Sequence, residues 1–285
     1  MADQVLAFDN PSPTSFPLAD AGQGVVVARA ASLESALPGT TAVFSTRLGG
    51  VSRSPWDQMN VGYQTGDSPV DVTENRRRLF RALDLDVEHL VTAGQVHGDA
   101  VGVATASGHQ PDTDGLVTLS RSLILAVFCA DCVPIWLLDP KTPAAAVVHA
   151  GWRGTLAGVA GRAVEVMRRK LGCRPGDLLA AIGPSIGPCC YEVGPEVSEP
   201  ARARLGSDVL AVPLPGGKAR LDLWEANRQS LIRAGLDPLR VDVSGLCTFC
   251  RGELFHSHRR ETVRSPASPR AGRMVALVKL PERRP

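Results

Sequence analysis

Residues 123–154, LILAVFCADCVPIWLLDPKTPAAAVVHAGWRG, contain the pattern that decides the fold. Two apolar runs, Leu123–Ala130 and Val133–Leu138, are broken only by Asp131-Cys132, and a third run, Ala144–His149, follows after a turn. Short continuous apolar runs that are bounded by turn residues are typical of buried strands. The stretch therefore predicts three short buried strands.

Helical patterns lie on both sides of this stretch. Apolar spacing and capping residues predict three helices, at about residues 68–84, 156–171 and 222–235. Further strands are expected at residues 24–29, 41–46 and 274–280. Because helices and strands are interspersed, we expect an α/β protein with mixed sheets. We expect one catalytic domain over residues 23–280, between a loosely ordered start at 1–22 and a tail at 281–285.

The composition is that of a soluble globular protein, with 44% hydrophobic and 21% charged residues over 285 positions. A net charge of +2 does not suggest a nucleic-acid or membrane surface. The longest clean apolar run is too short to span a bilayer, and the N-terminus does not read as a signal peptide. Seven cysteines are most simply explained as reduced thiols of a cytoplasmic protein.

Two imidazoles and one thiol stand out as potential metal ligands. His97 lies in Gln95–Gly98, Cys132 lies between two predicted strands, and His149 ends the third strand. Taken singly, each residue is more commonly a packed or surface side chain. Together they form the two-His, one-Cys set of a catalytic zinc site, whose fourth position is open to water or substrate. We therefore predict one zinc ion per chain, with adventitious copper as a further possibility at the open site.

Four other cysteines occur in two pairs. Cys247–Cys250 forms a CxxC pattern, which is found both in half of a zinc ribbon and in redox pairs. The sequence contains no second CxxC, and Gly252 argues against the helix that follows a redox pair. Cys189-Cys190 is expected to be structural, in a tight buried loop between Gly and Pro residues.

A series of short segments resembles a known family. The segments are FSTRLGGVS (44–52), NVGYQTGD (60–67), QVHG (95–98), ADCVP (130–134), HAGWRG (149–154), IGPSIGPCCY (182–191), CTFC (247–250), FHSHR (255–259) and GR (272–273). Together, from about residue 40 to residue 280, they resemble the YfiH/LACC-type family (DUF152). That family is also known as the multicopper polyphenol oxidase laccase domain and as peptidoglycan editing factor. The chain departs from the family pattern at His256 and His258, where an aromatic residue and Tyr are common.

The resemblance implies an α/β sandwich of mixed sheets and a zinc site made by His97, Cys132 and His149. It also implies purine nucleoside chemistry: phosphorolysis of adenosine, inosine, guanosine or 5′-methylthioadenosine, and deamination of adenosine. The expected partners are therefore purine nucleosides and phosphate. Zinc can polarise a substrate or supply hydroxide at neutral pH, and the second role suits deamination.

Three polar residues are candidates to contact the substrate or phosphate. Arg47 follows a strand in a Gly-rich turn and is the first candidate for a bidentate phosphate contact, with a surface ion pair as the alternative. Arg153 lies just before a predicted helix, where free N–H groups favour an anion. Asn60 offers amide contacts to a ribose or a base.

Two acidic residues are candidates for less direct roles. Asp131 adjoins a predicted ligand and could act in catalysis by orienting His97 or His149, with a simple turn role as the alternative. Asp114, in Asp112–Gly115, is assigned to turn chemistry. The remaining histidines are less promising as ligands: His89, His109, His256 and His258.

Four other functions compete with the purine enzyme. A multicopper oxidase needs about ten histidines for its copper centres, whereas the chain has six, so this function is unexpected. A Cys–His hydrolase would use Cys132 as nucleophile and His149 as base, and metal content distinguishes it because a zinc-bound thiolate is a poor nucleophile. A non-enzymatic binding module stabilised by zinc is disfavoured, because a site with three ligands leaves one position open. A peptidoglycan-precursor editing role comes only from the family resemblance.

Overall fold

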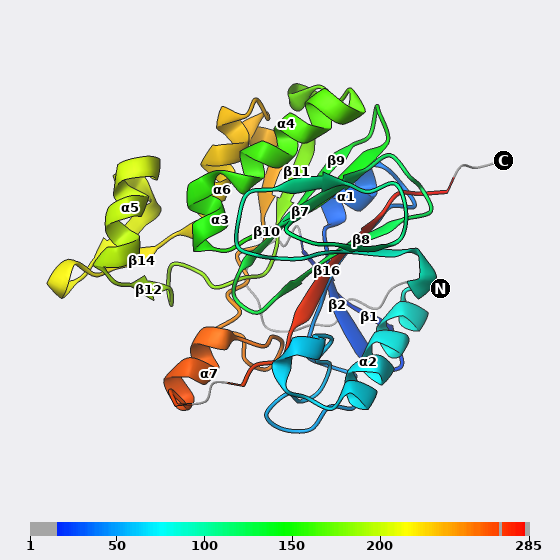
Figure 1. The fold of residues 1–285 in the computed structure, drawn as a ribbon, viewed down its shortest axis with the longest axis horizontal. Coiled ribbons are helices and arrows are strands. Elements are labelled where there is room, and N and C mark those ends of the chain that lie inside the picture. Colours follow the sequence, from blue (N-terminus) through cyan, green and yellow to red (C-terminus); the bar gives the residue numbers. More distant parts are fainter. Residues whose placement is uncertain (1–15, 268–269, 283–285) are drawn as a thin grey trace.

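The computed structural model describes residues 16–267 and 270–282. Within them, two large mixed sheets pack face to face, and helices cover their outer faces (Figure 1). The predicted fold class, an α/β sandwich of mixed sheets with flanking helices, is confirmed.

The first sheet has seven strands in the order β1-β2-β3-β16-β8-β4-β6. They are β1 (Leu18–Gly22), β2 (Val25–Arg29), β3 (Thr41–Ser45), β16 (Met274–Lys279), β8 (Ile124–Cys129), β4 (Leu90–Ala93) and β6 (Gly108–Gln110). The last strand of the chain, β16, lies at the centre of the sheet, antiparallel to β3 and β8. Strand β4 is parallel to both of its neighbours.

The second sheet has six strands in the order β15-β11-β9-β10-β7-β5. They are β15 (Val241–Val243), β11 (Leu179–Ile182), β9 (Val133–Asp139), β10 (Ala144–Ala150), β7 (Gly115–Thr118) and β5 (Val101–Val103). Strands β8 and β9 are consecutive in the chain but belong to different sheets. The chain therefore crosses from one sheet to the other at residues 130–132, which places Cys132 at one end of the sandwich.

A smaller third sheet lies beside the sandwich, at the left of Figure 1. It has the order β12-β14-β13, and its strands are β12 (Glu192–Val193), β14 (Ala219–Leu221) and β13 (Leu210–Pro213). Helix α5 (Pro195–Leu205) packs on it and also contacts α3. The third sheet thus extends from the loop that follows β11.

The remaining helices are α1 (Ala31–Ala36), α2 (Pro69–Ala82), α3 (Trp152–Ala157), α4 (Val159–Leu171), α6 (Leu223–Arg233) and α7 (His258–Arg264). Helices α4 and α6 bury the outer face of the six-stranded sheet, and α2 packs on the outer face of the seven-stranded sheet. Between the sheets, Trp136 of β9 is fully buried and its indole N–H donates to the Leu277 carbonyl of β16 at 2.9 Å. This bond ties the two sheets together inside the core.

Capping residues explain where the predicted helices begin. The Ser68 hydroxyl accepts from the Asp71 amide at the start of α2, and the Asp222 carboxylate accepts from the Glu225 amide at the start of α6. The helix predicted from about residue 156 is in fact two helices. Gly158 has a φ of 86°, in the left-handed region that favours glycine, so it ends α3 and lets α4 begin in a new direction.

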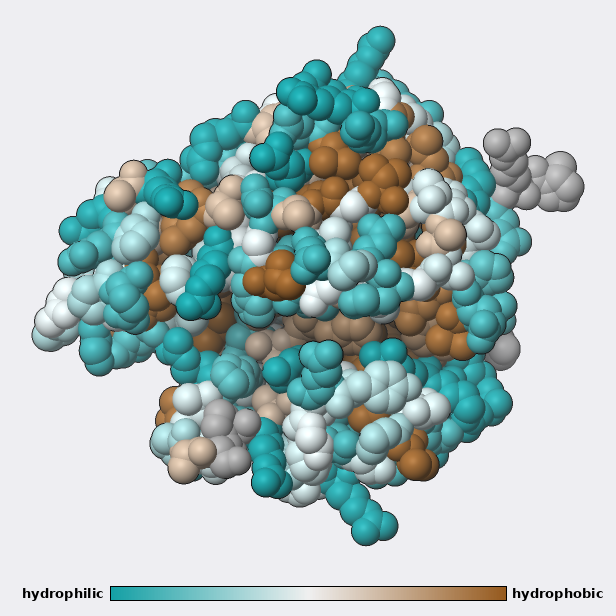
Figure 2. All heavy atoms as spheres, viewed as in Figure 1, coloured by the Kyte–Doolittle hydropathy of each residue, from teal (hydrophilic) through white to brown (hydrophobic). Residues whose placement is uncertain are grey.

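The ends of the chain are described only in part. Residues 18–22, within the start that we expected to be loosely ordered, form β1, whereas residues 1–15 of that start and residues 283–285 of the expected tail lie outside the described residues. None of the helices in the described part has the length and apolar character needed to cross a bilayer. Figure 2 shows that one face of the molecule is hollowed between its upper and lower parts.

Candidate active site

The three predicted metal ligands meet at one end of the sandwich. His97 comes from the loop between β4 and β5, Cys132 from the crossing between β8 and β9, and His149 from β10. Their donor atoms all lie within 4.8 Å of one another, and Cys132 Sγ is 4.0 Å from His97 Nε2. Gly151 makes room for them, since a Cβ there would lie 3.0 Å from His97 Cδ2 and 3.2 Å from Cys132 Sγ. The structure thus forms the donor set that the sequence predicts.

A buried carboxylate orients the His149 imidazole and holds the backbone of the His97 loop. Asp114 is fully buried, and its Oδ1 lies 2.8 Å from His149 Nδ1. The same carboxylate accepts from the backbone amides of His97 at 3.0 Å and Gly98 at 2.7 Å. With Nδ1 of His149 held by this acceptor, Nε2 is the nitrogen that remains for a metal. Asp114 therefore does more than the turn chemistry that we assigned to it.

Charges within the site favour the ligand form of the cysteine. Burial alone would raise the pKa of the Cys132 thiol, but His149 and His97 lower it to about 6. Burial also works against a charged His149, yet the Cys132 thiolate and Asp114 raise the pKa of His149 to about 9. Sulfur is therefore held as the thiolate, the form that binds metals, at neutral pH.

The backbone around these ligands is strained. His97, Gln95 and Asp131 have φ values of 63°, 57° and 88°, which are uncommon for residues other than glycine. The side chain of Gln95 holds its loop by pairing with the backbone of Phe128, accepting from its N–H at 2.8 Å and donating to its carbonyl at 2.6 Å. Such strained residues persist where surrounding contacts hold them, and they cluster at functional sites.

Asp131 has a different environment from the one that we expected. Its carboxylate accepts from the Thr248 hydroxyl and from the Arg259 backbone amide, both at 2.6 Å, and its carbonyl accepts from the Ile186 amide at 3.0 Å. The expected contact with His97 or His149 is not formed among the described residues. Asp131 instead joins the Cys132 segment to two distant loops, and Asp114 makes the orienting contact.

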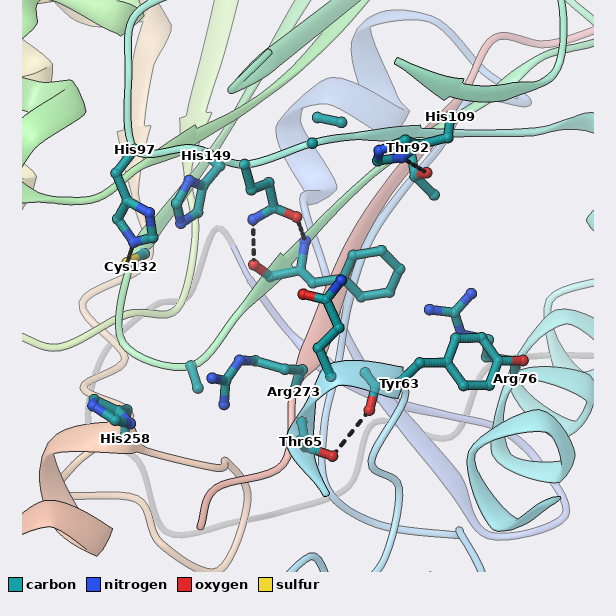
Figure 3. A pocket seen from close by; sticks show the side chains of 17 residues that line it. Tyr63, Thr65, Arg76, Thr92, His97, His109, Cys132, His149, His258 and Arg273 are labelled. Atoms are coloured by element: carbon teal, nitrogen blue, oxygen red, sulfur yellow. Dashed lines mark hydrogen bonds between the residues drawn. The ribbon is translucent and has the colours of Figure 1, made fainter. Parts of the chain in front are cut away.

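A cavity of about 590 Å³ opens beside the metal ligands. It is lined by Gly62, Tyr63, Gln64, Thr65, Arg76, Thr92, Ala93, Gly94, Gln95, His97, His109, Phe128, Ala130, Cys132, His149, His258 and Arg273. Figure 3 shows the metal ligands on one side of this pocket, Tyr63 and Arg76 on the other, and Arg273 between them. A pocket of this size suits a small organic ligand.

Two arginines bring positive charge to the pocket wall. The Arg76 guanidinium stacks between two aromatic rings, 4.3 Å from the Tyr63 centroid and 4.8 Å from that of Phe128. Arg273 donates through Nη1 to the carbonyls of Ala271 and Gly272. Burial lowers the pKa of both guanidinium groups, but arginine stays charged in proteins. The wall therefore combines aromatic surface with fixed cations.

Arg47, the first sequence candidate for a phosphate contact, is not among the described residues that line the cavity. Its guanidinium donates to the Asp57 carboxylate at 3.0 Å, to the Asp57 carbonyl at 2.7 Å and to the Gly252 carbonyl at 2.9 Å. The side chain is only 16% exposed, so these donors are already engaged. The geometry favours the ion-pair alternative.

The other two substrate candidates also lie outside the cavity lining. Asn60 is fully buried, and its amide accepts from the backbone N–H groups of Gly62 and Arg273 while donating to Thr65. Asn60 therefore shapes the loop that presents Tyr63, Gln64 and Thr65 to the pocket. Arg153 is exposed and stacks on the Trp152 ring at 4.3 Å.

Sequence reasoning missed several residues that line the pocket or orient its ligands. They are Tyr63, Arg76, His109, Asp114, Phe128, His258 and Arg273. Three lie inside quoted family motifs, namely Tyr63, His258 and Arg273, so those motifs were the signal available. For Arg76 and Phe128 the local pattern indicates only a helix and a strand, because their role depends on the packing of α2 against β8, which are far apart in the chain.

Known proteins are similar to this chain in sequence. Residues 41–281 match the family described as Multi-copper polyphenol oxidoreductase laccase. The chain is 39% identical over 255 residues to "Purine nucleoside phosphorylase YlmD" of Geobacillus stearothermophilus, covering 84% of this chain and 90% of the relative. It is 40% identical over 241 residues to a "Purine nucleoside phosphorylase" of Deinococcus radiodurans, covering 84% and 89%.

Solved structures agree with the sequence comparisons. The crystal structure of YlmD from Geobacillus stearothermophilus matches with a TM-score of 0.84 at 36% sequence identity, covering 95% of this chain and 100% of that chain. A Bacillus licheniformis protein named YfiH matches with a TM-score of 0.81 at 32% identity, covering 91% and 97%. The chain therefore belongs to the multi-copper polyphenol oxidoreductase laccase family, the YfiH/DUF152-type family whose motifs it carries.

Proposed function

We propose that the protein is a purine nucleoside phosphorylase that acts on adenosine, inosine, guanosine and 5′-methylthioadenosine, and that it also deaminates adenosine. The observation that carries the proposal is the pocket of about 590 Å³ that joins the His97–Cys132–His149 donor set to an aromatic and cationic wall. Relatives named purine nucleoside phosphorylase, at 39% and 40% identity, support the same activity.

The metal that best suits this donor set is zinc. Two imidazoles and a thiolate are common zinc ligands, and the three donors lie within 4.8 Å of one another. The family description names copper, but the six histidines of the chain are too few for a multicopper oxidase. When bound, zinc would supply a Lewis acid at the edge of the pocket. Asp114 would hold the proton on His149 Nδ1 and leave Nε2 as the nitrogen for such an ion.

The aromatic residues are suited to hold the base and the arginines the anion. Phe128 and Tyr63 offer ring surface to a purine, and Arg76 between them adds a cation. Arg273 lies between this wall and the metal ligands (Figure 3), and its guanidinium would bind a phosphate dianion in that part of the pocket. We therefore transfer the role of phosphate contact from Arg47 to Arg273.

In phosphorolysis, a phosphate oxygen forms a bond to C1′ of the ribose while the bond from C1′ to the purine nitrogen breaks. The electron pair of that bond leaves with the base. Arg273 would bind and orient the phosphate by charge-assisted hydrogen bonds, and the aromatic wall would hold the base in place. Phosphorolysis depends on the anion contact, whereas deamination consumes water and does not.

The deciding experiment incubates the zinc-loaded protein with adenosine, with and without phosphate, and separates the products by chromatography. Adenine with ribose-1-phosphate, formed only when phosphate is present, is the expected result for a phosphorylase. Inosine formed without phosphate is the result for a deaminase. Unchanged adenosine under both conditions would contradict the proposal.

A Cys–His hydrolase is the second candidate, because Cys132 Sγ lies within 4.8 Å of the His149 and His97 ring nitrogens. It is distinguished by metal content, since a hydrolase would be active without zinc and would be inhibited by loading with zinc. We place either enzyme in the cytoplasm, where reduced thiols persist, because all seven cysteines are free.

A further inference from the structure

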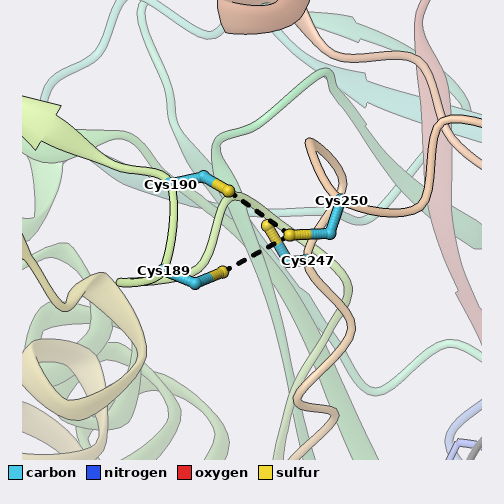
Figure 4. Close-up of side chains that lie close together, drawn as sticks. All are labelled: Cys189, Cys190, Cys247 and Cys250. Atoms are coloured by element: carbon cyan, nitrogen blue, oxygen red, sulfur yellow. Dashed lines mark hydrogen bonds between the residues drawn. The ribbon is translucent and has the colours of Figure 1, made fainter.

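Four cysteines that play no part in the pocket lie together in a second cluster. They are Cys189, Cys190, Cys247 and Cys250, and their sulfur atoms all lie within 4.8 Å of one another (Figure 4). Cys250 Sγ is 3.3 Å from Cys190 Sγ and 3.6 Å from Cys189 Sγ. Zinc–sulfur bonds of about 2.3 Å place the sulfurs of a tetrahedral site about 3.8 Å apart. The observed separations are therefore close to those of a four-thiolate metal site.

The fold brings the two pairs together. Strands β11 and β15 are parallel neighbours, so the loops that follow them begin at the same edge of the six-stranded sheet. Beyond the strands, Ser185 and Cys247 form an isolated parallel bridge. The Thr248 amide donates to the Ser185 carbonyl at 3.0 Å, and the Ser185 amide donates to the Leu246 carbonyl at 3.2 Å. The two loops are thus held against each other before the cysteines are reached.

Tight turns direct the thiols toward a common point. The Cys190 amide donates to the Gly187 carbonyl at 3.0 Å, and the Arg251 amide donates to the Cys247 carbonyl at 3.0 Å. The Gly187 amide in turn lies 3.3 Å from Cys247 Sγ, as a donor to the sulfur. Amide hydrogen bonds to a ligating sulfur are a frequent feature of thiolate metal sites.

Neither simpler explanation accounts for this arrangement. A disulfide requires sulfurs about 2.05 Å apart, and each cysteine can form only one, whereas Cys250 lies near two partners, at 3.3 Å and 3.6 Å. Cysteines that serve only as small hydrophobic residues are normally buried, but Cys189 and Cys250 are exposed. Four adjacent reduced thiols, two of them exposed, are best satisfied by a shared cation.

We propose that Cys189, Cys190, Cys247 and Cys250 form a second metal site, a closed four-thiolate site for zinc. Such a site has a structural role, because its four ligands leave no open position for substrate. The Cys247–Cys250 pattern is then one half of the site, as the zinc-ribbon alternative required. Its other half is the adjacent pair Cys189-Cys190, which a search for a second CxxC pattern does not find.

The second site is linked to the pocket through the residues that position Cys132. Thr248 lies between two of its ligands and donates to the Asp131 carboxylate at 2.6 Å. Ile186, in the loop of the other pair, donates its amide to the Asp131 carbonyl at 3.0 Å. Asp131 immediately precedes Cys132. A metal at the second site therefore holds the two loops that position the Cys132 segment.

The test counts metal in the full-length protein, purified with reductant and zinc. We expect about two zinc ions per chain in the wild type and about one in Cys132→Ala, which retains the four-thiolate site. Cys250→Ser should lose the other zinc and keep the one at His97, Cys132 and His149. Cys173→Ala, which changes a buried cysteine outside both groups, is the matched control and should keep both ions.

The ligands and the thiols can be identified independently of activity. X-ray absorption of the Cys132→Ala protein should show zinc with four sulfur neighbours at about 2.3 Å. In a separate preparation purified without reductant, all seven thiols should react after chelation and unfolding.

One zinc per chain in the wild type together with none in Cys132→Ala would overturn the proposal, even if Cys250→Ser does not fold. Five reactive thiols would also overturn it, because they would reveal a disulfide. The proposed nucleoside activity stands or falls separately, since it is measured on products and not on metal count.

Discussion

Replacing Asp114 with Asn tests how the metal ligands are held. The Asp114 carboxylate accepts three hydrogen bonds, from His149 Nδ1 at 2.8 Å, from the His97 amide at 3.0 Å and from the Gly98 amide at 2.7 Å. Asparagine keeps one acceptor oxygen, so its NH2 group must face either the Gly98 amide or the histidine contacts. At least one donor is then left without an acceptor in a buried site, and the negative charge beside His149 is lost.

The expected loss follows from these contacts. A hydrogen bond to a charged group contributes about 1.5–3 kcal/mol. Loss of an orienting carboxylate behind a ligating histidine lowers metal affinity about 10- to 100-fold. That range corresponds to about 1.4–2.8 kcal/mol, in agreement with one lost charge-assisted bond. The Asp114→Asn protein should therefore bind zinc at His97, Cys132 and His149 about 10- to 100-fold more weakly.

The assay is a competition between the protein and a chromophoric chelator for zinc, with folding checked by circular dichroism. Zinc held by the four-cysteine cluster is measured in Cys132→Ala and subtracted. Asp112→Asn, an exposed change in the same turn, is the matched control and should leave the affinity unchanged. The reasoning is refuted if folded Asp114→Asn binds zinc like the wild type, or if Asp131→Asn causes the larger loss.

Arg273→Ala should lower the rate of phosphorolysis about 10- to 100-fold and raise the KM for phosphate, because charge-assisted bonds worth about 1.5–3 kcal/mol are lost. Deamination in the same preparation should fall less. An equal loss of both activities would remove Arg273 from the phosphate site. Arg47→Ala should instead lower the free energy of unfolding by about 1–3 kcal/mol, through loss of its bonds to Asp57 and Gly252, and should leave the phosphate dependence of phosphorolysis unchanged. Chemical denaturation and steady-state kinetics measure the two effects. A changed phosphate dependence would return the phosphate contact to Arg47. Gly151→Ala should weaken zinc binding, because its Cβ would press on His97 and Cys132, and unchanged zinc affinity by chelator competition would contradict this geometry. Hydrogen bonds from Arg77 and Arg78, the larger effect being that of Arg77, lower the pKa of Glu74 to about 2. The stability that Glu74 contributes is therefore present above its ordinary pKa of 4.5 and is lost as the pH falls toward 2. Glu74→Gln should therefore show a shallower loss of thermal stability between pH 4.5 and 2, and parallel melting curves for the two proteins would contradict the shift.

Local patterns were sufficient for much of the fold. The apolar runs that form β8, β9 and β10 are each buried along nearly their whole length, as expected for continuous apolar runs that form buried strands. Caps at Ser68 and Asp222 placed two helix starts correctly, because a cap acts within one turn of the chain. Elements of three or four residues, such as β5 and β6, are too short to leave a readable period.

The sequence by itself determined the α/β class, the buried strands and the three side chains that could bind a metal, because period, capping and ligand type are local properties. Only the tertiary structure decided that Asp114 rather than Asp131 orients His149, and that Arg47 lies away from the pocket. The same is true of the four-cysteine cluster, whose two pairs meet through parallel strands far apart in the chain. These outcomes depend on which loops the sheet topology brings into contact, and the distance between two remote residues leaves no mark on the local sequence pattern around either one.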